Sequence, residues 1–278
     1  VREWVLFVGK FLGLALVLGA LMLSLAAAGV LAQTIMGHHE YEVGLYLGML
    51  FGLQLPEYLL FAVLALFVHV AVNQKYVAML AVLAGNLIMA PLSAVLVLAW
   101  VHRSRTPWHE IGYVRPRSWI GDAVIGIVFG SVLKLLMKAV VMPLLGADPI
   151  NQTYHYLVGN TAALPGMIFA VTVGAGWGEE TVFRGYLFER LGRVFGHGRG
   201  AQAAIVLLTA AFFGLAHYLE QGIAGVQQGM IVGLVFGAIY ATTGRLWMLM
   251  WAHAAFDLTA LAIIYWDLET DVARLIFD

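Results

Sequence analysis

The chain has 278 residues, of which 62% are hydrophobic and only 11% carry a charge. Soluble domains contain roughly 45–50% apolar residues, so this composition predicts a membrane protein rather than a soluble one. The formal net charge is -1 and no basic cluster accompanies it, so we expect no nucleic-acid partner. The sequence contains no cysteine, which excludes disulfides, thiolate metal ligands and a cysteine nucleophile.

Several apolar runs reach the length of about 20 residues that a helix needs to span a bilayer. In chain order they cover residues 5–34, 44–72, 77–102, 119–145, 161–189, 201–218, 222–242 and 246–266. The first run is longer than the apolar core of a signal peptide, so we expect a retained helix there. The predicted fold is all-α, a polytopic membrane protein of about eight transmembrane helices with an intramembrane polar cavity.

The positions of the arginines predict how these helices are oriented. One loop contains Arg103, Arg105, Arg115 and Arg117, a second contains Arg190, Arg193 and Arg199, and a third contains Arg245, whereas residues 148–160 have none. Loops rich in Lys and Arg face the cytoplasm, so we expect all three loops on that side. The protein is then an integral protein of the inner or plasma membrane, in contact with membrane lipids.

Ionisable residues lie inside the C-terminal apolar runs, among them Glu179, Glu180, Arg184, His217, His253 and Asp257. Each such group costs roughly 2.5–3.5 kcal/mol at the bilayer centre. We therefore expect these side chains to face one another around a hydrated cavity and to form a functional site. Two lysines in the fourth run, Lys134 and Lys138, are one helical turn apart, and a structural role lining a polar cavity is favoured for them over binding of anionic lipid headgroups.

The spacing of the six residues indicates a division of roles. Glu180 and Arg184 are at i and i+4 of a helix, where an ion pair forms, and the expected role of this pair is structural. Glu179 lies about 100° around the helix axis and has no partner in its own helix, so it is the candidate general base.

Two further segments place histidines at the same one-turn spacing from a second side chain. Phe213 precedes His217 by four residues, and His253 precedes Asp257 by four. A water held between Glu179 and His217 would be a nucleophile after deprotonation, and His253 would donate a hydrogen bond to the oxyanion of a peptide carbonyl. No His-Glu-x-x-His zinc motif occurs, and Ser131 lacks the sequence context of a serine nucleophile.

The ordered set Glu179-Glu180-x-x-x-Arg184, Phe213-x-x-x-His217 and His253-x-x-x-Asp257 resembles the motifs of the CAAX protease and bacteriocin-processing family, also called CPBP or Abi. Its best-known branch is the Ras-converting CAAX prenyl endopeptidase. The resemblance covers residues 105–266 and implies an intramembrane glutamate-type endopeptidase. In that reading Glu179 and His217 activate water, and His253 forms the oxyanion hole with the residue at position 257.

The same resemblance divides the chain and supplies the supporting residues. Residues 105–278 are expected to form the catalytic membrane domain, and residues 1–104 a set of N-terminal transmembrane helices of unassigned role. Glu180, Arg184 and Phe213 would support the site. The prenyl-protease branch has Asn where this chain has Asp257, and an ionised carboxylate would repel an oxyanion, so Asp257 is expected to orient His253 instead.

The predicted function is cleavage of a peptide or protein substrate, either a prenylated CAAX-like C-terminus or a bacterial peptide or membrane protein, in a site open toward the cytoplasmic side. No cofactor is expected. One alternative is a zinc-dependent membrane protease with Zn²⁺ held by Glu179, His217 and His253. The others are a non-enzymatic scaffold or bacteriocin-immunity protein and, last, a transporter, for which the expected inverted repeat is not found.

Overall fold

The structure is a computed structural model that describes residues 3–35, 37, 43–49, 51, 55, 75–196 and 198–277. All regular secondary structure in these residues is helical, as predicted. The chain divides into two compact units, Val1–Leu83 and Ala84–Asp278. The predicted division at residues 104 and 105 remains a prediction.

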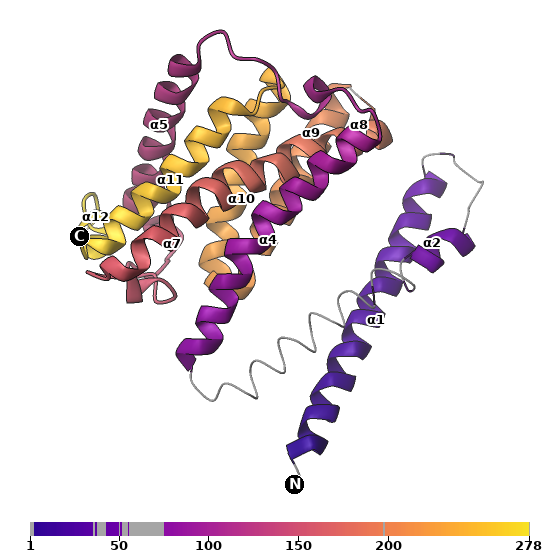
Figure 1. The fold of residues 1–278 in the computed structure, drawn as a ribbon, viewed down its shortest axis with the longest axis horizontal. Coiled ribbons are helices and arrows are strands. Elements are labelled where there is room, and N and C mark those ends of the chain that lie inside the picture. The colour runs from indigo at the N-terminus through magenta and orange to yellow at the C-terminus, as the bar shows by residue number, and fades with distance from the viewer. Residues whose placement is uncertain are drawn as a thin grey trace. The chain divides into compact units, whose positions relative to one another are not determined.

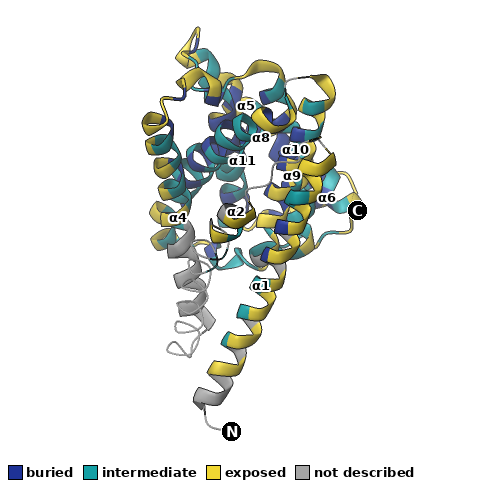
Figure 2. Ribbon diagram, turned by 90° about the vertical axis from the view of Figure 1, so that its right-hand side faces the viewer, coloured by how far each residue is buried: buried dark blue, intermediate teal, exposed yellow. Residues whose placement is uncertain are grey.

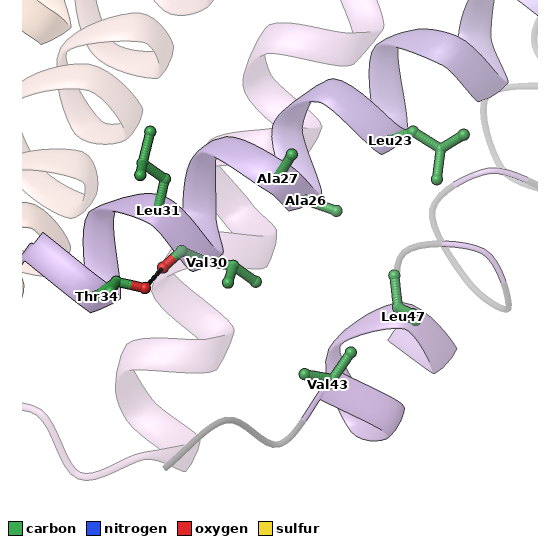
Figure 3. A pocket seen from close by; sticks show the side chains of 8 residues that line it. All are labelled: Leu23, Ala26, Ala27, Val30, Leu31, Thr34, Val43 and Leu47. Carbon is green, nitrogen blue, oxygen red and sulfur yellow. Dashed lines mark hydrogen bonds between the residues drawn. The ribbon is translucent and has the colours of Figure 1, made fainter. Parts of the chain in front are cut away.

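The first unit contains α1 (Glu3–Ile35) and α2 (Val43–Met49). Met22 and Ala26 of α1 are buried, and Leu47 of α2 packs against them. The two helices line a shallow apolar pocket (Figure 3), at whose end Thr34 Oγ1 donates a hydrogen bond of 2.7 Å to the carbonyl oxygen of Val30 within α1. Most of the predicted run 44–72 lies outside the described residues.

The second unit is a bundle of long helices with short helical connections (Figure 1). Its long elements are α4 (Lys75–Arg103), which begins before the boundary, α5 (Trp119–Leu136), α9 (Arg199–Ala216), α10 (Tyr218–Thr243) and α11 (Trp247–Tyr265). Its shorter elements are η2 (Trp108–Ile111), η3 (Met137–Val141), α6 (Met142–Leu144), η4 (His155–Leu157), η5 (Thr161–Ala163), α7 (Leu164–Phe169), η6 (Ala170–Glu179), η7 (Thr181–Leu187), α8 (Phe188–Phe195) and α12 (Glu269–Ala273).

Six helices among the described residues are long and apolar enough to cross a membrane, which makes the chain a polytopic membrane protein. They are Phe11–Ile35, Trp119–Leu144, Thr161–Phe195, Arg199–Ala216, Glu220–Thr243 and Trp247–Tyr265. A shorter apolar helix, Leu87–Arg103, corresponds to the third predicted run. Each of the five runs predicted after residue 118 therefore has a matching helix.

Helix α11 lies at the centre of the second unit, because α5 packs along one side of it and η6 along another. Small residues allow this close approach: a Cβ atom at Gly130 would overlap the carbonyl oxygen of Ala252, and one at Gly176 would lie 3.0 Å from that of Met250. Many buried positions lie on α5, α10 and α11 (Figure 2), and those of the three helices pack into one core. His253 of α11 is consequently buried, with 4% of its surface exposed.

The helix that contains the paired glutamates differs from the α-helix that its sequence predicts. It includes two π-helical stretches, η6 and η7, on either side of Glu180. Short π-helical insertions occur frequently at functional sites. The local winding around Glu179 is therefore wider than the 3.6 residues per turn assumed from the sequence.

Candidate active site

Glu180 and Arg184 form the innermost part of the site. Neither side chain has more than 1% of its surface exposed, and Nη1 of Arg184 donates to Oε1 of Glu180 across 2.7 Å. The guanidinium also lies over the ring of Phe213, 4.5 Å from its centroid. Burial of both charges in direct contact makes the pair a fixed element of the bundle rather than a surface clamp.

His253 of α11 is held by the same carboxylate oxygen. Its Nδ1 lies 2.7 Å from Oε1 of Glu180, and because a carboxylate accepts, Nδ1 carries the proton. The other ring nitrogen, Nε2, lies 3.8 Å from Oε2 of Glu179 and 3.6 Å from Oδ2 of Asp257. The ring therefore presents Nε2 to the two carboxylates that are not engaged with Arg184.

In the structure, the residue that makes a hydrogen bond to His253 is not the one expected from the sequence. Asp257 was expected to orient the imidazole, but its separation of 3.6 Å from Nε2 exceeds a hydrogen bond. Glu180 makes the orienting hydrogen bond in the structure. The orienting role of Asp257 remains a prediction, and the contribution of Glu180 was missed because it joins residues 73 positions apart on separate helices.

His217 lies at the C-terminal end of α9, where the helix stops. Its Nδ1 is 2.7 Å from the carbonyl oxygen of Phe213, so Nδ1 is the donor and Nε2 keeps its lone pair. A Cβ atom at Gly229 of α10 would lie 3.2 Å from this Nδ1. The absence of a side chain at Gly229 thus leaves room for the imidazole against α10.

Two buried phenylalanines pack against the imidazole rings of the site. The Phe213 ring contacts the imidazoles of both His217 and His253, with centroid separations of 4.8 and 5.7 Å. Phe236 of α10, with none of its surface exposed, also contacts the His253 ring, with a centroid separation of 5.7 Å. Phe213 was identified from the sequence, but Phe236 was not, because nothing in its local spacing distinguishes it from a core residue.

Glu179 completes the constellation. Its side chain is 27% exposed, unlike Glu180, and its buried Oε2 has no hydrogen-bond partner in the described residues. It interacts electrostatically with His253, His217 and Asp257. Glu179 and His253 are therefore neighbours, and the oxygen without a hydrogen bond lies 3.8 Å from the His253 ring. The meeting of Glu179 with His217 remains a prediction.

A metal ion requires three or more donors directed at one point. Within the part of the chain that the structure describes, no group of three His, Cys, Asp or Glu side chains has that arrangement. The donor set proposed for zinc contains His253, whose Nδ1 is bound to Glu180, so Nε2 is the atom that would coordinate a metal. The zinc alternative therefore remains a prediction.

A loop residue anchors the helix of the paired glutamates. Thr181 Oγ1 donates to the carbonyl oxygen of Trp177 at 2.7 Å, so its lone pair accepts from Oη of Tyr113 at 2.8 Å. Burial raises the pKa of the Tyr113 phenol above its ordinary value, which keeps it a donor. The arginine-rich loop between α4 and α5 is thereby connected to the residue that follows Glu180.

Comparison with known proteins gives one family match. Residues 161–259 match the family model described as Rce1-like, type II CAAX prenyl endopeptidase Rce1-like. The matched segment runs from η5 to Thr259 and includes the paired glutamates, Arg184, both histidines and Asp257. Neither the curated proteins nor the solved structures contain a significant match to this chain.

Proposed function

The chain belongs to the CAAX protease and bacteriocin-processing family through residues 161–259, and we propose that it is an intramembrane endopeptidase of the glutamate type. The observation that supports this most directly is the surroundings of Glu179. Its buried Oε2 accepts no hydrogen bond from the described residues and lies 3.8 Å from Nε2 of His253. A carboxylate oxygen without a hydrogen bond, next to an imidazole, is suited to remove a proton from water.

The proposed reaction begins with a water held by Glu179 and by Nε2 of His217. The lone pair on that nitrogen follows from the hydrogen bond between Nδ1 and the carbonyl oxygen of Phe213. Glu179 takes one proton as the water oxygen bonds to the peptide carbonyl carbon. The same carboxylic acid then delivers the proton to the leaving amine, so that the carboxylate is regenerated.

His253 is the proposed donor to the oxyanion of the tetrahedral intermediate. Its Nδ1 is fixed by Glu180, so only Nε2 is directed at the space beside Glu179, and a protonated ring donates from that atom. Glu180 is in turn fixed by Arg184. Such a preorganised donor in a water-poor site is usually the largest electrostatic contribution to catalysis.

The proposed access to the site is from the leaflet that faces the arginine-rich loops. His253 is six residues from the start of α11 at Trp247 and twelve from its end at Tyr265, which corresponds to about 9 Å and about 18 Å along the helix axis. Trp247 and Trp119 meet edge to face at 4.8 Å, as expected for aromatic residues at a membrane interface. The proposed substrates are peptides or membrane proteins, with a prenylated CAAX-like C-terminus as one class and bacterial peptides as the other.

Peptide cleavage by purified protein in detergent tests the proposal. Wild type, Glu179→Gln and His217→Ala would be incubated with matched farnesylated and unmodified CAAX-ending peptides and with an unmodified peptide library, and products would be read by mass spectrometry. We expect cleavage by wild type and a loss of at least about 100-fold in both variants. Glu110→Gln is the control, since this carboxylate is exposed in the short helix η2.

Each alternative predicts a different pattern in the same assay. A scaffold or immunity protein shows no Glu179-dependent cleavage with any peptide. A zinc protease loses activity with a chelator and recovers it when Zn²⁺ is restored, whereas the proposed mechanism is unaffected by chelation. Cleavage restricted to the farnesylated peptides assigns the prenylated class of substrate.

A further inference from the structure

A second cation, Lys134, is buried next to the site and has no role in the reaction proposed above. It lies on α5 with 8% of its surface exposed. Its Nζ donates to Oε1 of Gln228 on α10 at 3.0 Å and lies 4.8 Å from the centroid of the Phe256 ring on α11. Desolvation of an ammonium group is costly unless other groups compensate for it, so its position between three helices requires a reason.

Contacts on either side of Lys134 bring it to the level of Asp257. One turn earlier on α5, Ser131 Oγ accepts a hydrogen bond from Thr259 at 3.1 Å, and Lys134 itself contacts Phe256. Asp257 lies between these two positions of α11. Among the carboxylates of the residues that the structure describes, Asp257 attracts Lys134 more strongly than Glu269 does.

The neighbouring lysine, Lys138, forms an ion pair with a different carboxylate. Lys138 donates to Oε1 of Glu269 at 2.9 Å and to the carbonyl oxygen of Pro149, and Glu269 is almost completely buried. Lys138 repels Lys134 and has its own carboxylate partner. Lys134, which has no carboxylate partner of its own within 4 Å in the described part of the chain, is therefore available to act on Asp257.

The charges of the site explain why such a cation is needed. Glu179, Glu180 and Asp257 place three carboxylates around His253, of which Glu180 is fully buried and the other two are 27% exposed. Arg184 is paired with Glu180. Asp257 lies 3.6 Å from Nε2 of His253, on the side where an oxyanion would form. An uncompensated negative charge at that position would oppose the transition state, and the opposition is strong where water is scarce.

We infer that Lys134 is a positioning residue that compensates the charge of Asp257, so that His253 can serve an oxyanion next to a carboxylate. The inference rests on the proposed function. Gln228 holds the ammonium in place, and Phe256 covers it. In this arrangement Lys134 touches neither the substrate nor the reacting atoms, and its effect is transmitted through Asp257.

Kinetics of four proteins test the inference: wild type, Lys134→Met, Asp257→Asn and the double variant, with the library peptide that wild type cleaves fastest. We expect Lys134→Met to lower kcat by at least about tenfold with little change in KM, as for the loss of a transition-state interaction. The double variant should recover most of that loss, because the amide that replaces the carboxylate carries no charge to compensate. A double variant as slow as Lys134→Met overturns the inference, since a merely structural lysine would not be rescued.

The same variants give a test that does not depend on activity. Thermal unfolding should show that the effects of Lys134→Met and Asp257→Asn are non-additive, with the double variant more stable than the sum of the single changes predicts. Lys138→Met combined with Asp257→Asn is the matched control and should be additive. If the stability effects of Lys134→Met and Asp257→Asn are additive, the inference is overturned. If they are non-additive but wild type cleaves no peptide, only the proposed function is overturned.

Discussion

The imidazole of His253 donates from Nδ1 to Oε1 of Glu180 across 2.7 Å, and the same oxygen accepts from Arg184. One carboxylate therefore fixes a residue of its own helix and a residue of α11 at once. The second glutamate of the pair, Glu179, makes neither of these hydrogen bonds and lies 3.8 Å from the other ring nitrogen of His253. Glu179 and Glu180 are adjacent in the sequence but point in different directions, so they have different contacts.

Glu180→Gln should lower stability more than any other single change in the site. Removal of one partner from a buried ion pair costs about 3–5 kcal/mol, because the remaining charge has no compensation. Thermal unfolding in detergent measures the effect. Glu110→Gln breaks an exposed pair with Arg193 and should cost about 0–1 kcal/mol; equal effects in the two variants would contradict the assigned burial of the charge.

His253→Ala should abolish peptide cleavage, while Asp257→Asn should retain a substantial part of it. The first change removes the proposed oxyanion donor, for which losses of about 100- to 1000-fold are typical. The second keeps a polar side chain of the same shape and removes a charge. Comparison of kcat for both variants checks this, and a comparable loss in both would show that the carboxylate itself is required.

Phe213→Leu should lower activity, because its ring contacts both imidazoles and the guanidinium of Arg184. The cation–π contact of a desolvated Arg is worth about 2 kcal/mol, and its loss should also lower the unfolding temperature. Phe212 provides a matched control on the adjacent position of α9, since it is 53% exposed. Phe212→Leu should leave kcat and the unfolding temperature nearly unchanged, and a similar loss there would refute a specific role for Phe213.

Tyr113→Phe should remove one hydrogen bond to Thr181 and cost about 1 kcal/mol. Burial raises the pKa of Tyr113 in the folded protein, so its contribution to stability is complete below the unfolded value of about 10. That contribution is lost as the pH rises through the higher folded pKa. Unfolding temperatures measured between about pH 8 and 11 should therefore fall less steeply in Tyr113→Phe than in wild type.

The long apolar runs made most helices of the second unit predictable. The fourth run was expected to cover 119–145 and the last 246–266, and the structure has spans at Trp119–Leu144 and Trp247–Tyr265. Hydrophobic length alone decides such elements. The π-helical winding around Glu180 was not predictable, because it depends on how the segment packs against α4 and α11 rather than on its composition.

The site was predictable where its members are one helical turn apart. Glu180 with Arg184 and Phe213 with His217 follow from spacing within one helix. The hydrogen bond between Glu180 and His253 and the contact of Phe236 with His253 join separate helices, so their presence depends on interhelical register. That register is set by close contacts such as Gly130 against Ala252, which no local pattern reveals. The catalytic roles themselves remain predictions.

Both imidazoles of the site are tied through the same ring atom, one to a backbone carbonyl and the other to a carboxylate. Nitrogen-15 spectra of histidine-labelled protein should therefore show protonated Nδ1 in each ring. Both rings can thus be followed by their nitrogen-15 signals. A change of the His253 signal on substitution of Glu180 would report the hydrogen bond between these two residues without any substrate.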